Sequence, residues 1–180
     1  MSTARKVFAV AVLVALASAV APVTEAQPPI RIGASLAKTG VYAAPGQNQL
    51  RGYQLCVKHV NEKGGVLGRK LELVVYDDGS DPATAVRLYE KLITQDKVDL
   101  VLGPYSSPIS EAVADVNEKF KMPMVAPIAA ATSIYRQGRK FIFSVLPPVE
   151  VFLEGLIDMA AKKGLKSVAV ITQMTSLRGR

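Results

Sequence analysis

The stretch VDLVLGPYSSPISEAVADVNEKF, residues 98–120, predicts a strand, a loop and a helix around which the rest of the chain is arranged. A short apolar run ends abruptly at Gly103-Pro104, and the polar loop Tyr105-Ser106-Ser107 follows it. Pro108 suits the first turn of a helix, because the N–H that proline lacks would be unsatisfied there anyway. Apolar residues then recur at helical spacing, namely Ile109, Val113, Val116 and Phe120.

This order places a hydroxyl-rich loop between a buried strand and the N-terminus of a helix. Free backbone N–H groups and the helix dipole favour an anion at such a position. We therefore hypothesise that the loop holds the carboxylate of a small ligand. The alternative is an ordinary strand-to-helix turn that a serine caps.

The first 26 residues have the composition of a signal peptide. Arg5 and Lys6 precede a run of Ala, Val, Leu, Phe and Ser, residues 7–21, that is short for a membrane span. Cleavage fits after Ala26 or after Ala19, and a retained membrane anchor is the alternative. Because no cysteine lies near either position, we do not expect a lipid-anchored protein.

The rest of the chain alternates between strand and helix patterns. Strands are predicted at residues 30–36, 71–77, 98–102, 141–148 and 167–172, with a short one that begins at Met124. Helices are predicted from Gln47 to the glycines at 64–65, then at 82–93, 108–120, 134–138 and 151–163. This alternation predicts an α/β fold, a parallel sheet with helices on both faces.

Ligands of such sheets bind beyond the carboxyl ends of the strands. Three loops are expected there, residues 37–46, 103–108 and 127–133, and small or hydroxyl-bearing residues are frequent in all of them. Asp77, Asp78 and Asp81 also follow a strand, and we expect them to end that strand and cap the helix at Pro82 rather than to act as catalytic acids.

The sequence indicates binding without catalysis. His59 is the only histidine and Cys56 the only cysteine, so neither a Cys/His metal site nor a histidine-based triad can be assembled. We predict no cofactor and no disulfide, with Cys56 in the core and His59 in solvent. The formal net charge is +7, but its charges are scattered and tryptophan is absent, so nucleic-acid binding is not expected.

Five segments together resemble the solute-binding proteins of bacterial ABC importers, and more narrowly the leucine/isoleucine/valine-binding type with the type I periplasmic binding protein fold. They are RIGASLAKTG, the stretch from RGYQLC to DPATAV, VDLVLGPYSSP, MPMVAPIAAATS and KFIFSVLPP. The most distinctive parts are the turn N-x-K-G-G-x-x-G-x-x-[LI] at residues 61–71 and the strand end Y-D-D-x-x-D-P at residues 76–82.

The resemblance implies a monomeric periplasmic protein whose two lobes close around a solute and deliver it to a membrane permease. It implies that Ser107 donates to the ligand carboxylate and that the Ile128 carbonyl accepts from its ammonium group. Relatives often have a threonine that contacts both ends of the amino acid. That position is Ala130 in this chain, and Thr132 is displaced from it by two positions.

The same loops supply three further candidate ligand contacts, Tyr42, Tyr105 and Ser106. Relatives often have an aromatic residue in the first loop, at the position of Pro45 in this chain. Tyr42 lies nearby in the sequence and is included as its substitute. The departures at Pro45 and Ala130 leave open an amino acid, an amide, or an aromatic or aliphatic carboxylate as ligand.

The resemblance divides the chain into a signal peptide (1–26), an N-terminal ligand-binding lobe (27–148) and the beginning of a second lobe (149–180). Because relatives are more than twice as long, we expect a truncated or frameshifted chain that binds solute weakly or not at all. Two other functions stay open, a ligand-sensing module of the same fold and a flavodoxin-like enzyme domain.

Overall fold

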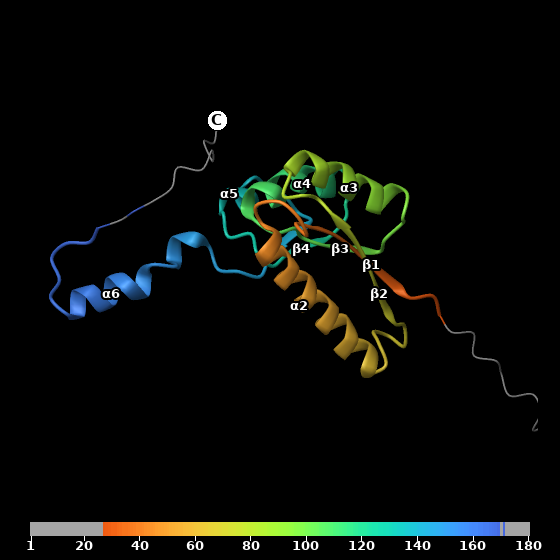
Figure 1. The fold of residues 1–180 in the computed structure, drawn as a ribbon, viewed down its shortest axis with the longest axis horizontal. Coiled ribbons are helices and arrows are strands. Elements are labelled where there is room, and N and C mark those ends of the chain that lie inside the picture. Colours follow the sequence, from red (N-terminus) through yellow and green to blue (C-terminus); the bar gives the residue numbers. More distant parts are fainter. Residues whose placement is uncertain (1–26, 170, 172–180) are drawn as a thin grey trace, which may run out of the picture.

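The computed structural model describes residues 27–169 and residue 171 (Figure 1). Within them lies a five-stranded, fully parallel sheet with the strand order β2-β1-β3-β4-β5. The strands are β1 (Ile30–Leu36), β2 (Leu71–Asp77), β3 (Leu100–Leu102), β4 (Met124–Ala126) and β5 (Ile142–Ser144). The predicted α/β parallel fold is confirmed, whereas the predicted signal peptide lies outside the described residues.

Helices lie on both faces of this sheet. They are α2 (Ala43–Glu62), α3 (Pro82–Thr94), α4 (Ser107–Phe120), α5 (Ser133–Arg136) and α6 (Glu154–Lys162), with a 3₁₀ turn η1 (Val149–Val151) before α6. Figure 1 shows α3 and α4 on one side and α2 on the other. Right-handed crossovers place α2 on the face opposite to α3 and α4. The chain crosses the sheet in one direction from β1 to β2, and in the opposite direction from β2 through β3 and β4 to β5.

The core lies between the sheet and the α3/α4 layer. Val101, Met124 and Ile142 are paired across β3, β4 and β5 and form one row of buried side chains on this face. The helices contribute the buried residues Ala85, Tyr89, Leu92, Ile109, Val113 and Val116 to the same cluster. In α3, Ala85, Tyr89 and Leu92 are the buried residues.

The aspartates after β2 have the structural roles that the sequence predicts. The Asp81 carboxylate accepts a hydrogen bond from the Thr84 N–H at 2.7 Å and caps α3, which begins at Pro82. Asp78 is 1% exposed and accepts hydrogen bonds from the Ser35 hydroxyl at 3.0 Å and the Ser80 N–H at 2.9 Å. These contacts bind the end of β2 to β1.

The first ligand-side loop is shorter than predicted, because α2 begins at Ala43 and not at Gln47. Pro45 is the third residue of the helix, where a backbone N–H has no intrahelical partner, so proline does not interrupt it. Gly46, also predicted in the loop, is buried in the first turn, where a Cβ atom would lie only 2.1 Å from the Ala37 carbonyl oxygen.

Two other predictions are wrong in the described part of the chain. Cys56 is exposed, although the apolar pattern of α2 predicts it in the core. Residues 167–169 and 171 form no strand, although they were predicted within a sixth strand at 167–172. Val168 is 53% exposed, and without a neighbouring strand its backbone has no ladder to join.

The described residues contain no helix both long and apolar enough to cross a membrane.

Candidate functional site

The three predicted ligand-side loops meet at the carboxyl edge of the sheet. They follow β1, β3 and β4, whose carboxyl ends lie side by side in the strand order. The Ser107 Oγ atom accepts a hydrogen bond from the Ala131 N–H at 3.2 Å, which joins the second loop to the third. The ring centroids of Tyr42 and Tyr105 lie 5.5 Å apart, and the ring planes are tilted by 51°. This aromatic contact joins the first loop to the second.

Two side chains of α2 hold the second loop. Gln49 Nε2 and the Tyr53 hydroxyl both donate to the Gly103 carbonyl, at 3.0 Å and 2.9 Å. Burial raises the pKa of Tyr53 far above its ordinary value, so its hydroxyl keeps the proton that it donates. Gly103 itself has no room for a side chain, since a Cβ atom would lie 2.9 Å from Ala126 Cα on β4.

Ser106 precedes α4 but does not cap it. Its backbone has φ of +79°, an uncommon conformation for a residue other than glycine, and its side chain makes no capping hydrogen bond. The Ser106 Oγ atom is buried and has no hydrogen-bond partner among the described residues. The serine cap that the alternative includes is therefore not formed by Ser106.

The first loop is held by the end of β2. The Asp77 carboxylate accepts from the Lys38 N–H at 2.9 Å and from the Thr39 hydroxyl at 2.9 Å. Ser80 Oγ donates to the Thr39 carbonyl at 2.8 Å and accepts from the Tyr42 N–H at 3.0 Å. Partial burial acts to raise the pKa of Asp77, but the hydrogen bonds that it accepts outweigh this effect and lower the pKa.

Residues of the third loop contact the second loop on one side and line a hollow on the other. The Ala131 N–H points toward Ser107, whereas Ala130 and Thr132 line a mostly apolar hollow of about 200 Å³. The other lining residues are Tyr135, Ser144, Leu146 and Pro148. Thr132 donates its hydroxyl to Glu150, and this hydrogen bond lowers the pKa of the glutamate.

The predicted site residues thus fall into two groups. Tyr42, Tyr105, Ser106 and Ser107 lie on the first and second loops, and Ser107 contacts the third loop directly. Ala130 and Thr132 line the hollow, and Ile128 is half-buried on the same loop. Gln49, Tyr53 and Ala131 were not predicted. Nothing in a single sequence shows that two helix side chains would share the Gly103 carbonyl.

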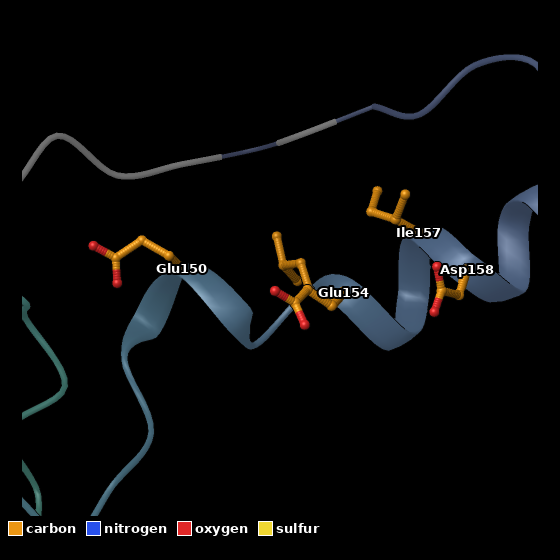
Figure 2. A pocket seen from close by; sticks show the side chains of 5 residues that line it. Glu150, Glu154, Ile157 and Asp158 are labelled. Atoms are coloured by element: carbon orange, nitrogen blue, oxygen red, sulfur yellow. The ribbon is translucent and has the colours of Figure 1, made fainter.

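A second hollow, of about 300 Å³, lies along the η1–α6 segment. Figure 2 shows Glu150, Glu154 and Asp158 along this segment, with Ile157 among them. All its lining residues come from this one segment, so it is an open surface depression and not an enclosed site. No group of His, Cys, Asp and Glu suited to a metal ion occurs in the described part of the chain.

The chain is similar to known binding proteins. The family model described as periplasmic binding protein matches residues 29–178. The leucine-, isoleucine-, valine-, threonine- and alanine-binding protein of Pseudomonas aeruginosa is 34% identical over 65% of this chain and 31% of its own length.

Two solved structures are similar over most of the chain. A leucine-binding protein from Thermotoga maritima has 32% identity and a TM-score of 0.65, over 76% of this chain and 37% of its own. An ABC-transporter solute-binding protein from Rhodopseudomonas palustris, in complex with 3,4-dihydroxybenzoic acid, has 26% identity and a TM-score of 0.68, over 77% and 37%. The match therefore spans well under half the length of these relatives.

Proposed function

This chain belongs to the periplasmic binding protein family, and from that premise we propose that it is the extracytoplasmic solute-binding component of an ABC importer. It works in the periplasm, binds an amino acid or a related small carboxylate, and presents it to a membrane permease. The relatives are binding proteins and not enzymes, and this chain acts by binding alone.

The observation that carries the proposal is the position of Ser107 at the junction of two loops. Because its Oγ atom accepts from the Ala131 N–H, the hydroxyl proton is left to be donated to a ligand carboxylate. Ser107 is also the first residue of α4, where the backbone N–H groups have no intrahelical partner and the helix dipole favours an anion.

The proposed ligand lies against one wall that the three loops form together. Its carboxylate meets Ser106 and Ser107, and its ammonium group, where it has one, meets the Ile128 carbonyl. The tilted pair of Tyr42 and Tyr105 forms the aromatic side of this wall. Ala130 has no hydroxyl group to contact both ends of an amino acid, so aromatic and aliphatic carboxylates are included in the ligand class.

Weak binding to a single wall is best detected by NMR on the ¹⁵N-labelled 180-residue chain. We expect L-leucine or 3,4-dihydroxybenzoate to shift the backbone amide signals of Tyr105, Ser107 and Ala131 in a saturable way. Leucinamide, which lacks the carboxylate, should shift them far less. If neither carboxylate moves these signals at millimolar concentration, the proposed wall is wrong.

A matched pair of variants separates the site from general surface effects. Ser107→Ala should abolish the saturable shifts, because it removes the hydroxyl that would meet the carboxylate. Ser133 is the exposed first residue of α5 and lies outside the proposed wall. Ser133→Ala should therefore leave the shifts unchanged. Equal loss in both variants would contradict the role given to Ser107.

A further inference from the structure

The backbone that leads into the loop of Ser107 is held from three helices. Each of the three consecutive carbonyl groups of residues 102–104 accepts a hydrogen bond from a helix side chain. The donors are Tyr89 of α3 (2.5 Å), Gln49 and Tyr53 of α2 (3.0 Å and 2.9 Å) and Ser110 of α4 (3.5 Å). The contact of Ser110 is the weakest of these, because its distance is long for a hydrogen bond between two oxygen atoms.

Gly103 is the most firmly held residue of this segment. Its N–H donates to the Val125 carbonyl on β4 at 2.7 Å, and its carbonyl accepts from both Gln49 and Tyr53, the number of bonds that its two lone pairs allow. Gln49 Nε2 also donates to the Tyr53 hydroxyl at 2.7 Å, so the two donors hold each other in place. We call Gln49 and Tyr53 the Gly103 clamp.

Three residues after Gly103, the backbone of Ser106 has a strained conformation. Its φ of +79° and ψ of 150° lie in a region that is essentially restricted to glycine. Such a conformation persists only where the surrounding contacts impose it. The Ser106 side chain does not supply them, because its Oγ atom has no partner among the described residues. The contacts on either side of Ser106 therefore impose the conformation, namely the Gly103 clamp before it and the bond between Ser107 and Ala131 after it.

We propose that Gln49 and Tyr53 are positioning residues for ligand binding. By holding Gly103 they keep Ser106 in its strained conformation, so that the Ser107 hydroxyl is in place before the ligand arrives. The inference rests on the proposed function, in which Ser107 meets the ligand carboxylate, and the clamp itself does not touch the ligand. A loop that is already ordered loses less entropy on binding, and a chain that populates the competent loop only in part binds more weakly in proportion.

A role in stability alone can be separated from this positioning, because α2 offers a matched comparison. Asn61 lies on the same helix, and its side chain makes two hydrogen bonds to the Leu71 backbone, at 2.9 Å and 2.7 Å. Leu71 begins β2, so these bonds lie at the edge of the sheet opposite to the ligand loops. Asn61→Ala should therefore make the chain less stable to urea and leave the affinity for ligand unchanged.

The first measurement is the affinity of the ¹⁵N-labelled 180-residue chain for L-leucine and for 3,4-dihydroxybenzoate, from the saturable shifts of its amide signals. Tyr53→Phe removes one donor to Gly103 and keeps the aromatic ring. We expect this variant to bind about two- to tenfold more weakly, the ratio that the loss of one ordinary hydrogen bond gives. Asn61→Ala is the control and should bind as the wild type does. The dispersion of the amide signals shows that each variant is folded.

A rescue experiment separates positioning from general damage. Glycine adopts a positive φ without strain, so Ser106→Gly should keep the loop in place even when the clamp is weakened. In the Tyr53→Phe background, Ser106→Gly should bind both carboxylates several-fold more tightly than Ser106→Ala. Both double variants lack the Ser106 hydroxyl, so they differ only at the backbone. With the clamp intact, the two substitutions should give similar affinities.

The conformation of Ser106 can also be followed without ligand, because the coupling and the nuclear Overhauser effect between its amide and α protons report φ. We expect a positive φ in the wild type and in Asn61→Ala, and a shift toward negative φ in Tyr53→Phe. This measurement tests the clamp even if no ligand binds.

Three results would overturn the proposal. The first is a Tyr53→Phe variant with unchanged affinity. The second is weaker binding with an unchanged φ at Ser106, because the effect then does not pass through this residue. The third is a failure of Ser106→Gly to restore binding. A wild-type chain that binds neither carboxylate contradicts the proposed function instead, and φ in Tyr53→Phe then decides whether the clamp holds the loop.

Discussion

The Ser107 side-chain oxygen accepts a hydrogen bond from the Ala131 backbone N–H at 3.2 Å, across 24 positions of sequence. The contact joins the loop after β3 to the loop after β4, and it is made by the residue that we propose as the carboxylate donor. Ser107 therefore has a structural role that can be measured without any ligand.

The first prediction is that Ser107→Ala lowers the free energy of unfolding by about 0.5–1.5 kcal/mol, the usual net contribution of one hydrogen bond. The half-buried Ala131 N–H loses its partner in this variant. Urea denaturation followed by circular dichroism measures the change. Ser133→Ala serves as the control because its side chain is exposed, and equal stability of the wild type and Ser107→Ala would show that the contact is not maintained in solution.

Much of the fold could be predicted because local patterns determine it. The alternation at residues 30–36 and the Asp81-Pro82 helix start depend only on neighbouring residues, and the structure agrees with both. The alternation of strands and helices then predicts the parallel sheet, and with it the edge at which the three loops meet. The position of Ser107 follows from these local elements.

The failures come from contacts between distant segments. The pattern of α2 places Cys56 on the apolar flank, but burial of that flank depends on distant segments, and among the described residues Cys56 is exposed. The strand predicted at residues 167–172 has no neighbouring strand to pair with in the described residues. Ser106 has a positive φ and a buried hydroxyl, and a single sequence reveals neither feature.

The second prediction concerns two glycines of the same helix. Gly46→Ala should lower the free energy of unfolding by about 1–3 kcal/mol, the usual cost of overpacking, because the new methyl group would meet the Ala37 carbonyl at 2.1 Å. Gly52→Ala has open space around it and should raise the free energy of unfolding by about 0.5–1 kcal/mol through its better helix propensity.

Both glycine variants are measured by urea denaturation beside the wild-type chain. The sign of the two effects is the test. A gain of stability in Gly46→Ala would contradict the packing of the first turn of α2 against the first loop, and a loss in Gly52→Ala would contradict the open space around Gly52.

The third prediction is that Tyr89→Phe lowers the free energy of unfolding by about 1–3 kcal/mol. Tyr89 is fully buried, and its hydroxyl donates to the carbonyl of half-buried Leu102 at 2.5 Å, so the variant leaves this carbonyl with one partner fewer. Chemical denaturation measures the loss. Tyr42→Phe is the matched control, because the Tyr42 hydroxyl makes no hydrogen bond within the described residues, and a comparable loss there would argue against a specific role for the Tyr89 contact.

The fourth prediction is a pH dependence with a defined sign. Burial raises the pKa of Asp78 above its ordinary value of 3.8, and the nearby charges of Asp77 and Asp81 add to this effect, although hydrogen bonds from Ser80 and Ser35 oppose it. The folded chain therefore binds the Asp78 proton more tightly than the unfolded chain does. Its contribution to stability is present below pH 3.8 and is lost as the pH rises through the raised pKa.

Asp78→Asn removes this titration while leaving an oxygen to accept from the Ser80 N–H. The free energy of unfolding of the wild type minus that of the variant should fall as the pH rises above 3.8 and then level off. Asp81→Asn is the control of opposite sign, because hydrogen bonds from Thr84 lower the pKa of Asp81 and its contribution is lost as the pH falls. Denaturation curves between pH 2 and pH 8 give both differences, and a rising difference for Asp78 would mean that its carboxyl is stabilised in the charged form.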